Sequence, residues 1–328
     1  MKVKAFSARP DEAPYFDLFA KQYGQELEKC PDALTMDNID SVKGFEGLSL
    51  VHDGNLTDEV LKAAHDRGVK YIALRTIGYD GINLKLARNL GMRISNASYS
   101  PYSVANYTVM LMLMCIRRAL YILMRSHTAD DSLGSARGME MQNMTVGVIG
   151  TGRIGKAVIQ NLRGFGCKII AYDIYPSDIA GVEYVTLDEL YRRSDIITLH
   201  TFLSPQTEHM INAEALSKMK DGVIIINAAR GGLIDTGALI DAIESGKVGG
   251  AGIDCVEGEE SVVRTDHRYG DRVTNHDYII LKSFQNTIIS PHVAFYTDQA
   301  VSDMVRSSLE SLDHFEKGEK APLEVTNR

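Results

Sequence analysis

Residues 145–155 read Thr-Val-Gly-Val-Ile-Gly-Thr-Gly-Arg-Ile-Gly, an apolar run followed by glycines in the pattern G-x-G-x-x-G. The apolar run is typical of a buried strand, and residues 154–163 have the spacing of a helix. In a strand–turn–helix unit of this kind, Gly150 allows the tight turn, Gly152 lets the backbone approach a pyrophosphate, and Gly155 allows close packing. The stretch therefore predicts a parallel α/β domain that binds a dinucleotide with its phosphates at the start of the helix.

An acidic residue follows the next predicted strand, which covers residues 168–172. Asp173 stands at the distance from the last glycine at which a carboxylate accepts hydrogen bonds from the adenosine ribose hydroxyls. A 2′-phosphate would be repelled by the same negative charge. The sequence therefore predicts NAD rather than NADP as the cofactor.

Length and composition describe an ordinary globular protein of two domains. The chain has 328 residues, of which 45% are hydrophobic and 24% are charged, and its formal net charge is -8. Lysine and arginine are spread along the chain, so no basic face for nucleic acid or an anionic membrane is expected. The most apolar run, residues 109–116, is too short to span a bilayer, and residues 1–6 do not resemble a signal peptide.

The four cysteines lie far apart in the sequence and form no C-x-x-C pair; they are Cys30, Cys115, Cys167 and Cys255. This spacing favours small buried side chains in a reducing compartment over disulfides or a metal site. We therefore expect a cytoplasmic protein without a metal site.

Short apolar runs alternate with helical patterns along almost the whole chain. The predicted strands cover residues 2–6, 48–52, 71–74, 145–149, 168–172, 196–199, 223–226, 250–253 and 287–289. The predicted helices between them cover residues 14–23, 58–67, 84–89, 154–163, 187–192 and 237–244. This alternation is typical of parallel sheets built from βαβ crossovers. The predicted fold class is α/β, with two Rossmann-like domains whose parallel sheets are flanked by helices.

The order of these segments indicates that the N-terminal domain is discontinuous. A proline opens a long helical pattern over residues 102–124, and a last helix is predicted over residues 297–317. We expect this last helix to return to the first domain. The predicted domains are a substrate (catalytic) domain of residues 1–100 plus 298–328 and an NAD-binding domain of residues 101–297.

Polar residues follow three later strands, at the edge of the sheet where ligands bind in α/β folds. Arg230 follows the aliphatic run 223–226, and a guanidinium in that turn can hold a carboxylate through two hydrogen bonds. Residues 254–259 contain three carboxylates, and His292 follows Ser-Pro after the strand at 287–289. Taken singly, these features are also explained by a capping arginine, a solvated acidic loop and a turn histidine. Their combination after a dinucleotide-binding turn predicts a catalytic site.

Taken together, these motifs resemble the D-2-hydroxyacid dehydrogenase family over nearly the whole chain. Among its branches the chain is most similar to the D-lactate dehydrogenases, including the vancomycin-resistance type. The stretches that carry this resemblance are Arg-Thr-Ile-Gly-Tyr-Asp at residues 75–80, Ser-Tyr-Ser-Pro-Tyr-Ser-Val-Ala at 98–105, Leu-Arg-Gly-Phe-Gly-Cys-Lys at 162–168 and Pro-His-Val-Ala-Phe-Tyr-Thr at 291–297.

The resemblance implies roles for individual residues. Arg230 would hold the substrate, His292 would act as acid and base, and Glu259 would be the carboxylate paired with that histidine. Asp254 would contact the nicotinamide carboxamide. The other implied contacts are Arg153, Ile154, Thr201, Phe202, Thr207, Ala228 and Ala229 with the cofactor, and Ile77, Gly78, Tyr99 and Phe295 with the substrate.

The chemistry of the side chains agrees with the implied catalytic roles. Adding a hydride to C2 of a 2-keto acid places negative charge on the keto oxygen, which then needs a proton. A carboxylate beside His292 favours the imidazolium that delivers this proton, and Arg230 stabilises negative charge on the substrate. We therefore expect reversible NADH-dependent reduction of a small 2-keto acid such as pyruvate to the D-2-hydroxy acid.

Other substrates and one other class of protein remain open. The alternative substrates are the bulkier 2-keto acids 2-ketoisocaproate, phenylpyruvate and 2-oxoglutarate. A remote alternative is an NAD-sensing regulator of the corepressor type, which keeps the fold and the polar residues but works by binding partners. The family also implies a homodimer, formed through the helical segment at residues 102–124.

Four residues depart from the pattern of the family or of one of its branches. Many relatives carry Val-Pro where this chain has Thr201-Phe202, and Asn106 stands where an acidic residue is common. Asp173 differs from the small neutral residue that members of the vancomycin-resistance branch can carry when they use NADP. Residues 262–283 are interpreted as a surface segment rather than as a functional insert.

Overall fold

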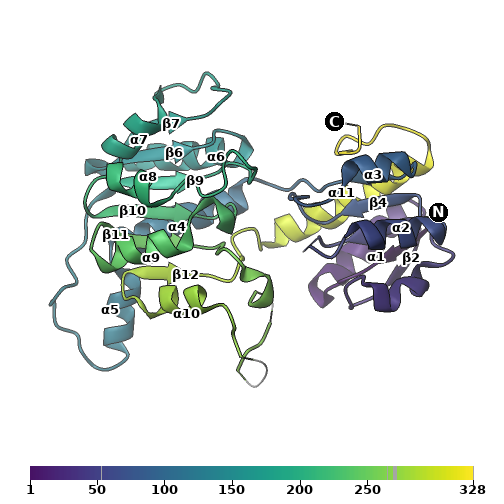
Figure 1. Ribbon diagram of the computed structural model, residues 1–328, viewed down its shortest axis with the longest axis horizontal. Helices are drawn as coiled ribbons and strands as arrows, with labels where there is room; N and C mark the ends of the chain where they lie inside the picture. Colours follow the sequence, from purple (N-terminus) through teal and green to yellow (C-terminus); the bar gives the residue numbers. More distant parts are fainter. Residues whose placement is uncertain (53, 264, 269–271, 328) are drawn as a thin grey trace. The chain divides into compact units, whose positions relative to one another are not determined.

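The computed structural model describes residues 1–52, 54–263, 265–268 and 272–327. The chain forms two compact units: the first unit consists of Met1–Ser100 and Tyr296–Arg328, and the central unit consists of Pro101–Phe295. Each unit is built on its own parallel sheet with helices on both faces (Figure 1). The predicted α/β class with two Rossmann-like parts is therefore confirmed, whereas the roles assigned to the two domains stay a prediction.

The sheet of the first unit has five parallel strands in the order β2-β1-β3-β4-β5. On one face, Phe16 of α1 and Leu309 of α11 belong to the same apolar cluster as Val3. On the other face, Leu61 of α2 clusters with Leu48. The elements are β1 (Lys2–Ala5), α1 (Ala13–Gln22), β2 (Glu26–Lys29), β3 (Gly47–Leu50), α2 (Asp58–Asp66), β4 (Tyr71–Leu74), α3 (Leu84–Asn89), β5 (Arg93–Ser95) and α11 (Asp298–Glu316).

The sheet of the central unit has seven parallel strands in the order β12-β11-β10-β9-β6-β7-β8, which run from bottom to top in Figure 1. Helices α4 and α6 cover one face, and α7, α8, α9 and α10 cover the other. The strand order reverses between β6 and β9, and ligands bind at the carboxyl ends beside such a reversal. The elements are α4 (Tyr102–Ile116), α5 (Ala119–Ser126), β6 (Thr145–Ile149), α6 (Arg153–Leu162), β7 (Lys168–Tyr172), β8 (Glu183–Tyr184), α7 (Leu187–Arg193), β9 (Ile196–Leu199), α8 (Ala213–Lys218), β10 (Val223–Asn227), α9 (Thr236–Glu244), β11 (Val248–Ile253), α10 (His276–Ser283) and β12 (Thr287–Ile289).

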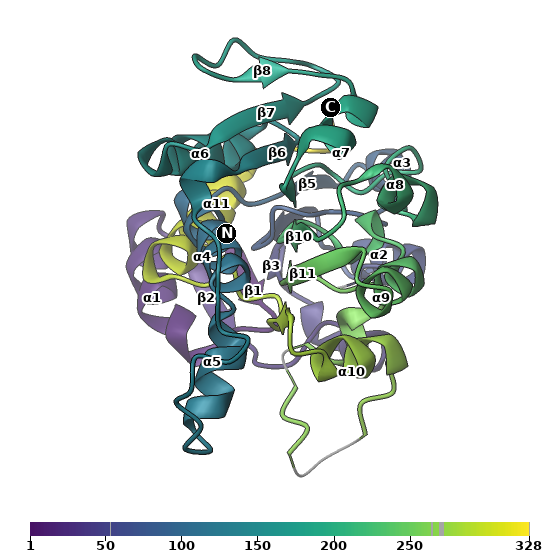
Figure 2. The same ribbon diagram turned by 90° about the vertical axis from the view of Figure 1, so that its left-hand side faces the viewer.

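The long helix predicted over residues 102–124 is wrong, because the chain bends between α4 and α5. Arg118 adopts the left-handed conformation, with φ of 51°, and the two helix axes differ by 66°. A residue with positive φ cannot continue a right-handed helix. Beyond the bend, α5 lies at the end of α4, away from the strands (Figure 2).

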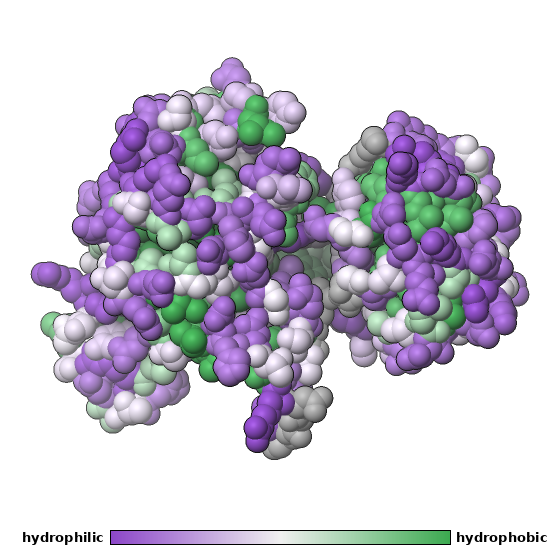
Figure 3. All heavy atoms as spheres, viewed as in Figure 1, coloured by the Kyte–Doolittle hydropathy of each residue, from purple (hydrophilic) through white to green (hydrophobic). Residues whose placement is uncertain are grey.

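Among the described residues, no single helix has both the length and the apolar character that a membrane crossing requires. Only α4 and α5 taken together, which are bent by 66°, have that length and composition. Hydrophilic side chains cover most of the face shown in Figure 3, with hydrophobic patches between them.

Several short elements were not predicted from the sequence. The strand β2 reads Glu-Leu-Glu-Lys and pairs on one side only, so it lacks the apolar run of a central strand. Helix α10 lies within residues 262–283, which were interpreted as a surface segment; its Tyr278 and Leu281 are buried, and Asn275 caps its first turn. Residues 264 and 269–271 of that segment lie outside the described residues.

Candidate active site

The carboxyl ends of the strands in the central unit carry most of the predicted site residues. The structure places Gly150, Gly152, Arg153, Ile154 and Gly155 between β6 and α6, Asp173 after β7, Thr201, Phe202 and Thr207 after β9, Ala228, Ala229 and Arg230 after β10, Asp254 and Glu259 after β11, and His292 and Phe295 after β12. Because parallel strands end at the same edge of their sheet, these residues share one edge. The predicted residues Ile77, Gly78 and Tyr99 belong to the first unit.

The glycine turn after β6 is tightly packed at two of its glycines and open at the third. A Cβ at Gly150, whose φ is 90°, would lie 2.6 Å from the carbonyl oxygen of His200, and a Cβ at Gly155 would lie 2.0 Å from that of Gly150. At Gly152, in contrast, a Cβ would meet no described atom within 4 Å. Gly152 also begins α6 without a side-chain cap. The turn is thus packed on its inner side and open where a pyrophosphate would approach the helix.

Asp173 is held in place by the glycine turn. Its Oδ2 accepts hydrogen bonds from the backbone N–H of Thr151 at 2.6 Å and from the Thr151 hydroxyl at 2.9 Å, and its Oδ1 accepts one from the N–H of Tyr175 at 2.9 Å. Partial burial acts to raise the pKa of Asp173, but these hydrogen bonds outweigh it and lower the pKa. The carboxylate is therefore fixed in its charged form at the end of β7. The Tyr184 hydroxyl, which the sequence did not single out, donates to Thr151 at 3.0 Å.

The loop after β9 is shaped by one of its predicted residues. The hydroxyl of Thr207 donates to the carbonyl oxygen of Phe202 at 2.6 Å and accepts from the N–H of Ser204 at 2.9 Å. The Phe202 side chain is 74% exposed. Thr207 therefore fixes the loop that presents this aromatic ring.

Arg230 lies in a turn that a buried asparagine holds. The Asn227 amide Nδ2 donates to the carbonyl oxygen of Arg230 at 2.8 Å, and its Oδ1 accepts from the N–H of Ala229 at 3.0 Å. Nη1 of Arg230 donates to the carbonyl oxygen of Ala229 at 2.7 Å. The sequence did not identify Asn227 as a site residue, because an asparagine at the end of a strand has no distinct pattern.

Asp254 is almost fully buried and ties the end of β11 to the loop after β12. Its Oδ1 accepts from the Ser290 hydroxyl at 2.6 Å and from the N–H of Val293 at 3.0 Å, while its Oδ2 accepts from the N–H of Ala294 at 2.8 Å. Its own carbonyl oxygen accepts from the N–H of His292 at 2.9 Å. The side chain implied to contact the nicotinamide thus also positions the loop that carries the histidine.

Glu259 and His292 form a hydrogen-bonded pair at this edge. Nδ1 of His292 lies 2.6 Å from Oε1 of Glu259, and Oε2 of Glu259 accepts from the N–H of Val256 at 2.8 Å. The side chains are 27% and 12% exposed, respectively, so the pair is partly shielded from water. His292 has a φ of 55°, and its ring meets the Phe295 ring edge-on at 6.4 Å between centroids. A hydrogen bond to a carboxylate of this kind orients the imidazole.

Two other histidines near the strand ends have different surroundings. His200 follows β9; burial lowers the pKa of its imidazole to about 3, so this side chain is neutral. His209 lies 2.7 Å from Oε1 of Glu257, and this hydrogen bond raises the pKa of His209. The pairing of Glu257 with His209 leaves Glu259 as the carboxylate that contacts His292.

Cys255 joins the histidine–carboxylate pair in space. Its sulfur, a Glu259 oxygen and a His292 ring nitrogen all lie within 4.8 Å of one another. The thiol is buried, and burial raises its pKa well above the ordinary value. All four cysteines are free thiols. The sequence led us to expect no metal site among the cysteines, and it gave no signal for this cluster.

In the first unit, the turn that contains Ile77 and Gly78 is held by hydrogen bonds to the carbonyl oxygens of these two residues. Asn96 Nδ2 donates to the carbonyl oxygen of Ile77 at 2.8 Å, and the Thr76 hydroxyl donates to that of Gly78 at 2.9 Å. Within the described part of the chain, neither the Ile77 nor the Gly78 N–H has a hydrogen-bond acceptor. Two such N–H groups can bind an anion. Tyr99 follows β5 in the same unit.

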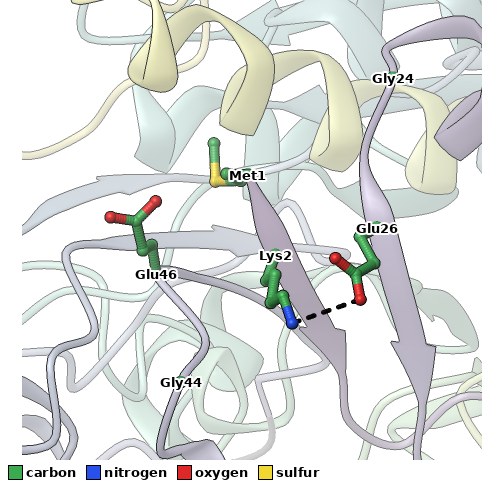
Figure 4. A pocket seen from close by; sticks show the side chains of 6 residues that line it. All are labelled: Met1, Lys2, Gly24, Glu26, Gly44 and Glu46. Carbon is green, nitrogen blue, oxygen red and sulfur yellow. Dashed lines mark ion pairs between the residues drawn. The ribbon is translucent and has the colours of Figure 1, made fainter.

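A hollow of about 560 Å³ lies elsewhere on the first unit, and Figure 4 shows it. It is lined by residues at the amino ends of β1, β2 and β3, among them Lys2, Glu26 and Glu46, and Lys2 forms an ion pair with Glu26. Ligands of parallel sheets bind at the opposite, carboxyl ends. We therefore assign the hollow no part in the candidate active site.

Two chemical capacities meet at the sheet edge of the central unit. The glycine turn and Asp173 fit the pyrophosphate and ribose of a dinucleotide, and the glycines at which a Cβ would clash show that the backbone is built for this turn. At the same edge a histidine fixed by a carboxylate can carry a proton. A dinucleotide-binding turn and a histidine that can carry a proton at one edge define the class: an oxidoreductase that works with a nicotinamide dinucleotide.

Known proteins agree with this class. The family model of the NAD-binding domain of the D-isomer specific 2-hydroxyacid dehydrogenases matches residues 109–294. An aromatic 2-oxoacid reductase of Clostridium sporogenes is 42% identical over 320 residues, which cover 96% of each chain. A D-lactate dehydrogenase of Lactiplantibacillus plantarum is 40% identical over 99% of each chain. The solved structure of a D-2-hydroxyisocaproate dehydrogenase, 36% identical, superposes with a TM-score of 0.89 over 99% of this chain and 100% of its own.

The chain belongs to the D-isomer specific 2-hydroxyacid dehydrogenase family, and it is an NAD-dependent D-2-hydroxyacid dehydrogenase. The resemblance found in the sequence is therefore confirmed, as is the prediction of NAD as cofactor. The relatives differ in the substrates that their names give, so they do not fix the 2-keto acid.

Proposed function

We propose that the protein reduces a small 2-keto acid, pyruvate in the first place, to the D-2-hydroxy acid with NADH, and that the reaction is reversible. The observation that carries this proposal is the 2.6 Å contact between His292 Nδ1 and Glu259 Oε1 at the sheet edge that also holds the dinucleotide turn. A keto oxygen that receives negative charge needs a proton donor beside it, and an imidazolium held by a carboxylate meets that need.

In the proposed mechanism each side chain has one task. NADH, when bound, supplies the hydride to C2 of the substrate. Glu259 holds Nδ1 of His292, so that Nε2 delivers the proton to the keto oxygen, and in the reverse direction Nε2 accepts the proton from the hydroxyl. The Arg230 guanidinium binds the substrate carboxylate and stabilises the charge that develops beside it. The N–H groups of Ile77 and Gly78 would bind the same carboxylate, and Tyr99 and Phe295 would contact the substrate side chain.

The cofactor contacts belong to the same proposal. We assign the pyrophosphate to Gly150, Gly152, Arg153, Ile154 and Gly155, and the ribose hydroxyls to Asp173. Asp254 would contact the nicotinamide carboxamide. Thr201, Phe202, Thr207, Ala228 and Ala229 would line the rest of the cofactor site.

Replacing the two central side chains tests this mechanism. His292→Ala and Arg230→Ala should each lower kcat/KM for pyruvate at least about 100-fold, because each removes a group that acts on the transition state. NADH binding, measured by fluorescence titration, should change little. A variant that keeps near-normal reduction would remove its residue from the mechanism.

Aromatic 2-oxo acids are the second candidate substrates, since the relatives at 42% identity are named aromatic 2-oxoacid reductases. Relatives named D-lactate dehydrogenases at 40% identity support pyruvate about equally. A panel of pyruvate, 2-ketoisocaproate, phenylpyruvate and 2-oxoglutarate assayed with NADH separates the candidates. A kcat/KM for phenylpyruvate well above that for pyruvate would replace the first proposal by the second.

We also propose that two copies of the chain associate through α4 and α5. Met110 of α4 and Leu123 and Met124 of α5 are exposed, and an apolar hollow between α4 and α6 is lined by Val109, Met110 and Leu113, among other residues. Asn106, which departs from the family pattern, accepts a hydrogen bond from Asn161 at 2.9 Å beside this hollow. A helix that is apolar on its outer face as well as its inner face is typical of an interface.

Light scattering after size exclusion should give the mass of a dimer for the native chain and of a monomer for Met110→Glu. Leu18→Glu, at an exposed apolar position of α1 in the first unit, is the matched control and should stay dimeric. A monomeric native chain at working concentration would contradict the proposal. A cytoplasmic location also remains a prediction, which cell fractionation would test.

A further inference from the structure

The buried thiol of Cys255 faces the proposed proton-transfer pair, and no step of the mechanism uses it. Its sulfur, a carboxylate oxygen of Glu259 and a ring nitrogen of His292 lie within 4.8 Å of one another. These three atoms come from two neighbouring loops, because β11 and β12 pair in parallel and both loops follow their carboxyl ends. The neighbouring strands therefore assemble three metal-ligating groups of different chemistry.

The three atoms lie 2.6 to 4.8 Å apart, a range that includes the spacing of a tetrahedral site. Zinc binds thiolate sulfur at about 2.3 Å and imidazole nitrogen or carboxylate oxygen at about 2.0–2.2 Å, so its ligand atoms lie roughly 3–4 Å apart. The shortest separation here, 2.6 Å between His292 Nδ1 and Glu259 Oε1, must widen by less than about 1 Å for an ion to enter. Glu259 can make this change, since its Oε2 keeps the anchor to the N–H of Val256.

The charges around the thiol also favour a cation. Asp254 and Glu259 act on the Cys255 sulfur as negative charges, and Arg230 acts on it as a positive charge. The charge around the sulfur is therefore negative on balance, which favours a divalent cation at this place.

We propose that Cys255, Glu259 and His292 form a binding site for a thiophilic divalent cation, Zn²⁺ or Cd²⁺, and that the bound ion inhibits the enzyme. On binding, the thiol proton and any proton shared between His292 and Glu259 leave to solvent, and bonds from the metal to sulfur, nitrogen and oxygen replace them. No electron is transferred. The inhibition rests on the proposed function, because the ion takes the position of the proton that His292 and Glu259 would handle; the binding itself does not.

The ligand set also predicts which cations bind. Thiolate and imidazole prefer zinc and cadmium, whereas magnesium and calcium prefer oxygen ligands. Zn²⁺ and Cd²⁺ should therefore inhibit reduction of pyruvate, and Mg²⁺ at the same concentration should not. A chelator should restore the activity.

Cadmium alone, added to the full chain without substrate, tests the binding directly. Formation of a cadmium–thiolate bond gives an ultraviolet charge-transfer band, which should reach its end point at one ion per chain. Cys255→Ala and Cys255→Ser should both lose the band, and their affinity for Zn²⁺ should fall by at least about tenfold. Cys30→Ala removes a thiol of the first unit and should keep both properties. The two kinds of Cys255 variant are compared because alanine leaves a small void whereas serine keeps the size of the side chain.

Activity without metal supplies the second readout. Cys255→Ala should keep its rate of NADH oxidation within about a factor of two while losing its sensitivity to Zn²⁺. A missing band in the native chain, or a band that persists in both Cys255 variants, would overturn the site. A normal band without any inhibition would keep the site and reject the assignment of His292 and Glu259 to proton transfer, so the two failures are distinguishable.

Discussion

The carboxylate of Asp254 accepts a 2.6 Å hydrogen bond from the hydroxyl of Ser290. Because the same carboxylate also accepts from the N–H groups of Val293 and Ala294, one side chain after β11 fixes the loop after β12. The position of His292, which lies within this loop, therefore depends on a residue with two acceptor oxygens and no donor.

Asp254→Asn should destabilise the protein by about 1–3 kcal/mol, because the amide NH2 would face a buried N–H group and leave it without an acceptor. Unfolding in urea measures this change. Asp266→Asn replaces a carboxylate that pairs with Arg268 at the surface and should alter stability by less than about 0.5 kcal/mol. If Asp254→Asn were as stable as the native chain, the loop after β12 would not depend on the Asp254 carboxylate for its conformation.

Glu259→Gln should lower kcat/KM for reduction about 100-fold, because an amide does not compensate the positive charge of the imidazolium that donates the proton. Steady-state rates of NADH oxidation with pyruvate measure this loss. Glu257→Gln, which alters the neighbouring pair with His209, is the matched control and should keep the native kcat/KM. Near-native reduction by Glu259→Gln would argue against a role for the pair of Glu259 and His292.

Asp173→Ser should weaken NADH binding by about tenfold, equivalent to about 1.4 kcal/mol, and narrow the preference for NADH over NADPH. The cause is the loss of a charged acceptor for the ribose hydroxyls and of the repulsion that excludes a 2′-phosphate. Dissociation constants for both cofactors provide the measurement. Asp178→Ser, at an exposed position five residues on, should leave both constants unchanged. If Asp173→Ser kept the native preference for NADH over NADPH, residues other than Asp173 would determine that preference.

Gly152→Ala and Gly155→Ala should fail in different ways. The methyl group at position 152 would have no described atom within 4 Å, so Gly152→Ala should unfold at the same temperature as the native chain. It should bind NADH poorly, because the methyl group would occupy the space through which the pyrophosphate approaches the helix. The methyl at position 155 would lie 2.0 Å from the carbonyl oxygen of Gly150 and should lower both stability and binding. Thermal unfolding and NADH titration distinguish them, with the exposed Gly164→Ala as control. Tight NADH binding by Gly152→Ala would exclude the proposed phosphate position.

His200 should make the protein sensitive to acid. Its pKa is about 3 in the folded chain and about 6.5 when unfolded. Between these values the unfolded chain binds a proton that the folded chain does not, so stability is complete above about pH 6.5 and falls by about 1.4 kcal/mol for each pH unit below it. The pH dependence of unfolding should be shallower in His200→Gln and unchanged in His127→Gln, whose side chain is exposed. Parallel curves for His200→Gln and the native chain would refute this assignment.

The sequence predicts those helices and strands that are fully buried or that depend mainly on contacts between residues close together in the chain. The run Val223–Asn227 is a strand in the sequence because four consecutive aliphatic residues need cover on both faces. The polar edge strand β2 is not predicted, because an edge strand can form by pairing with one neighbour and needs no apolar run. The bend at Arg118 is not predicted either, because a single residue with positive φ produces no recognisable pattern in the sequence. The same limit applies to the site: the glycine turn is visible in sequence, whereas the contacts of Asp254 with Ser290 and of Cys255 with His292 arise only when β11 and β12 lie side by side.

The backbone at His292 has a consequence for engineering. A left-handed residue with a side chain costs roughly 1 kcal/mol or more, and glycine and asparagine occupy this region most easily. Selection for thermal stability alone would therefore favour Gly or Asn at position 292, and either replacement would remove the imidazole. Stabilising substitutions should be sought at other positions, because at this one a gain in stability would cost catalytic activity.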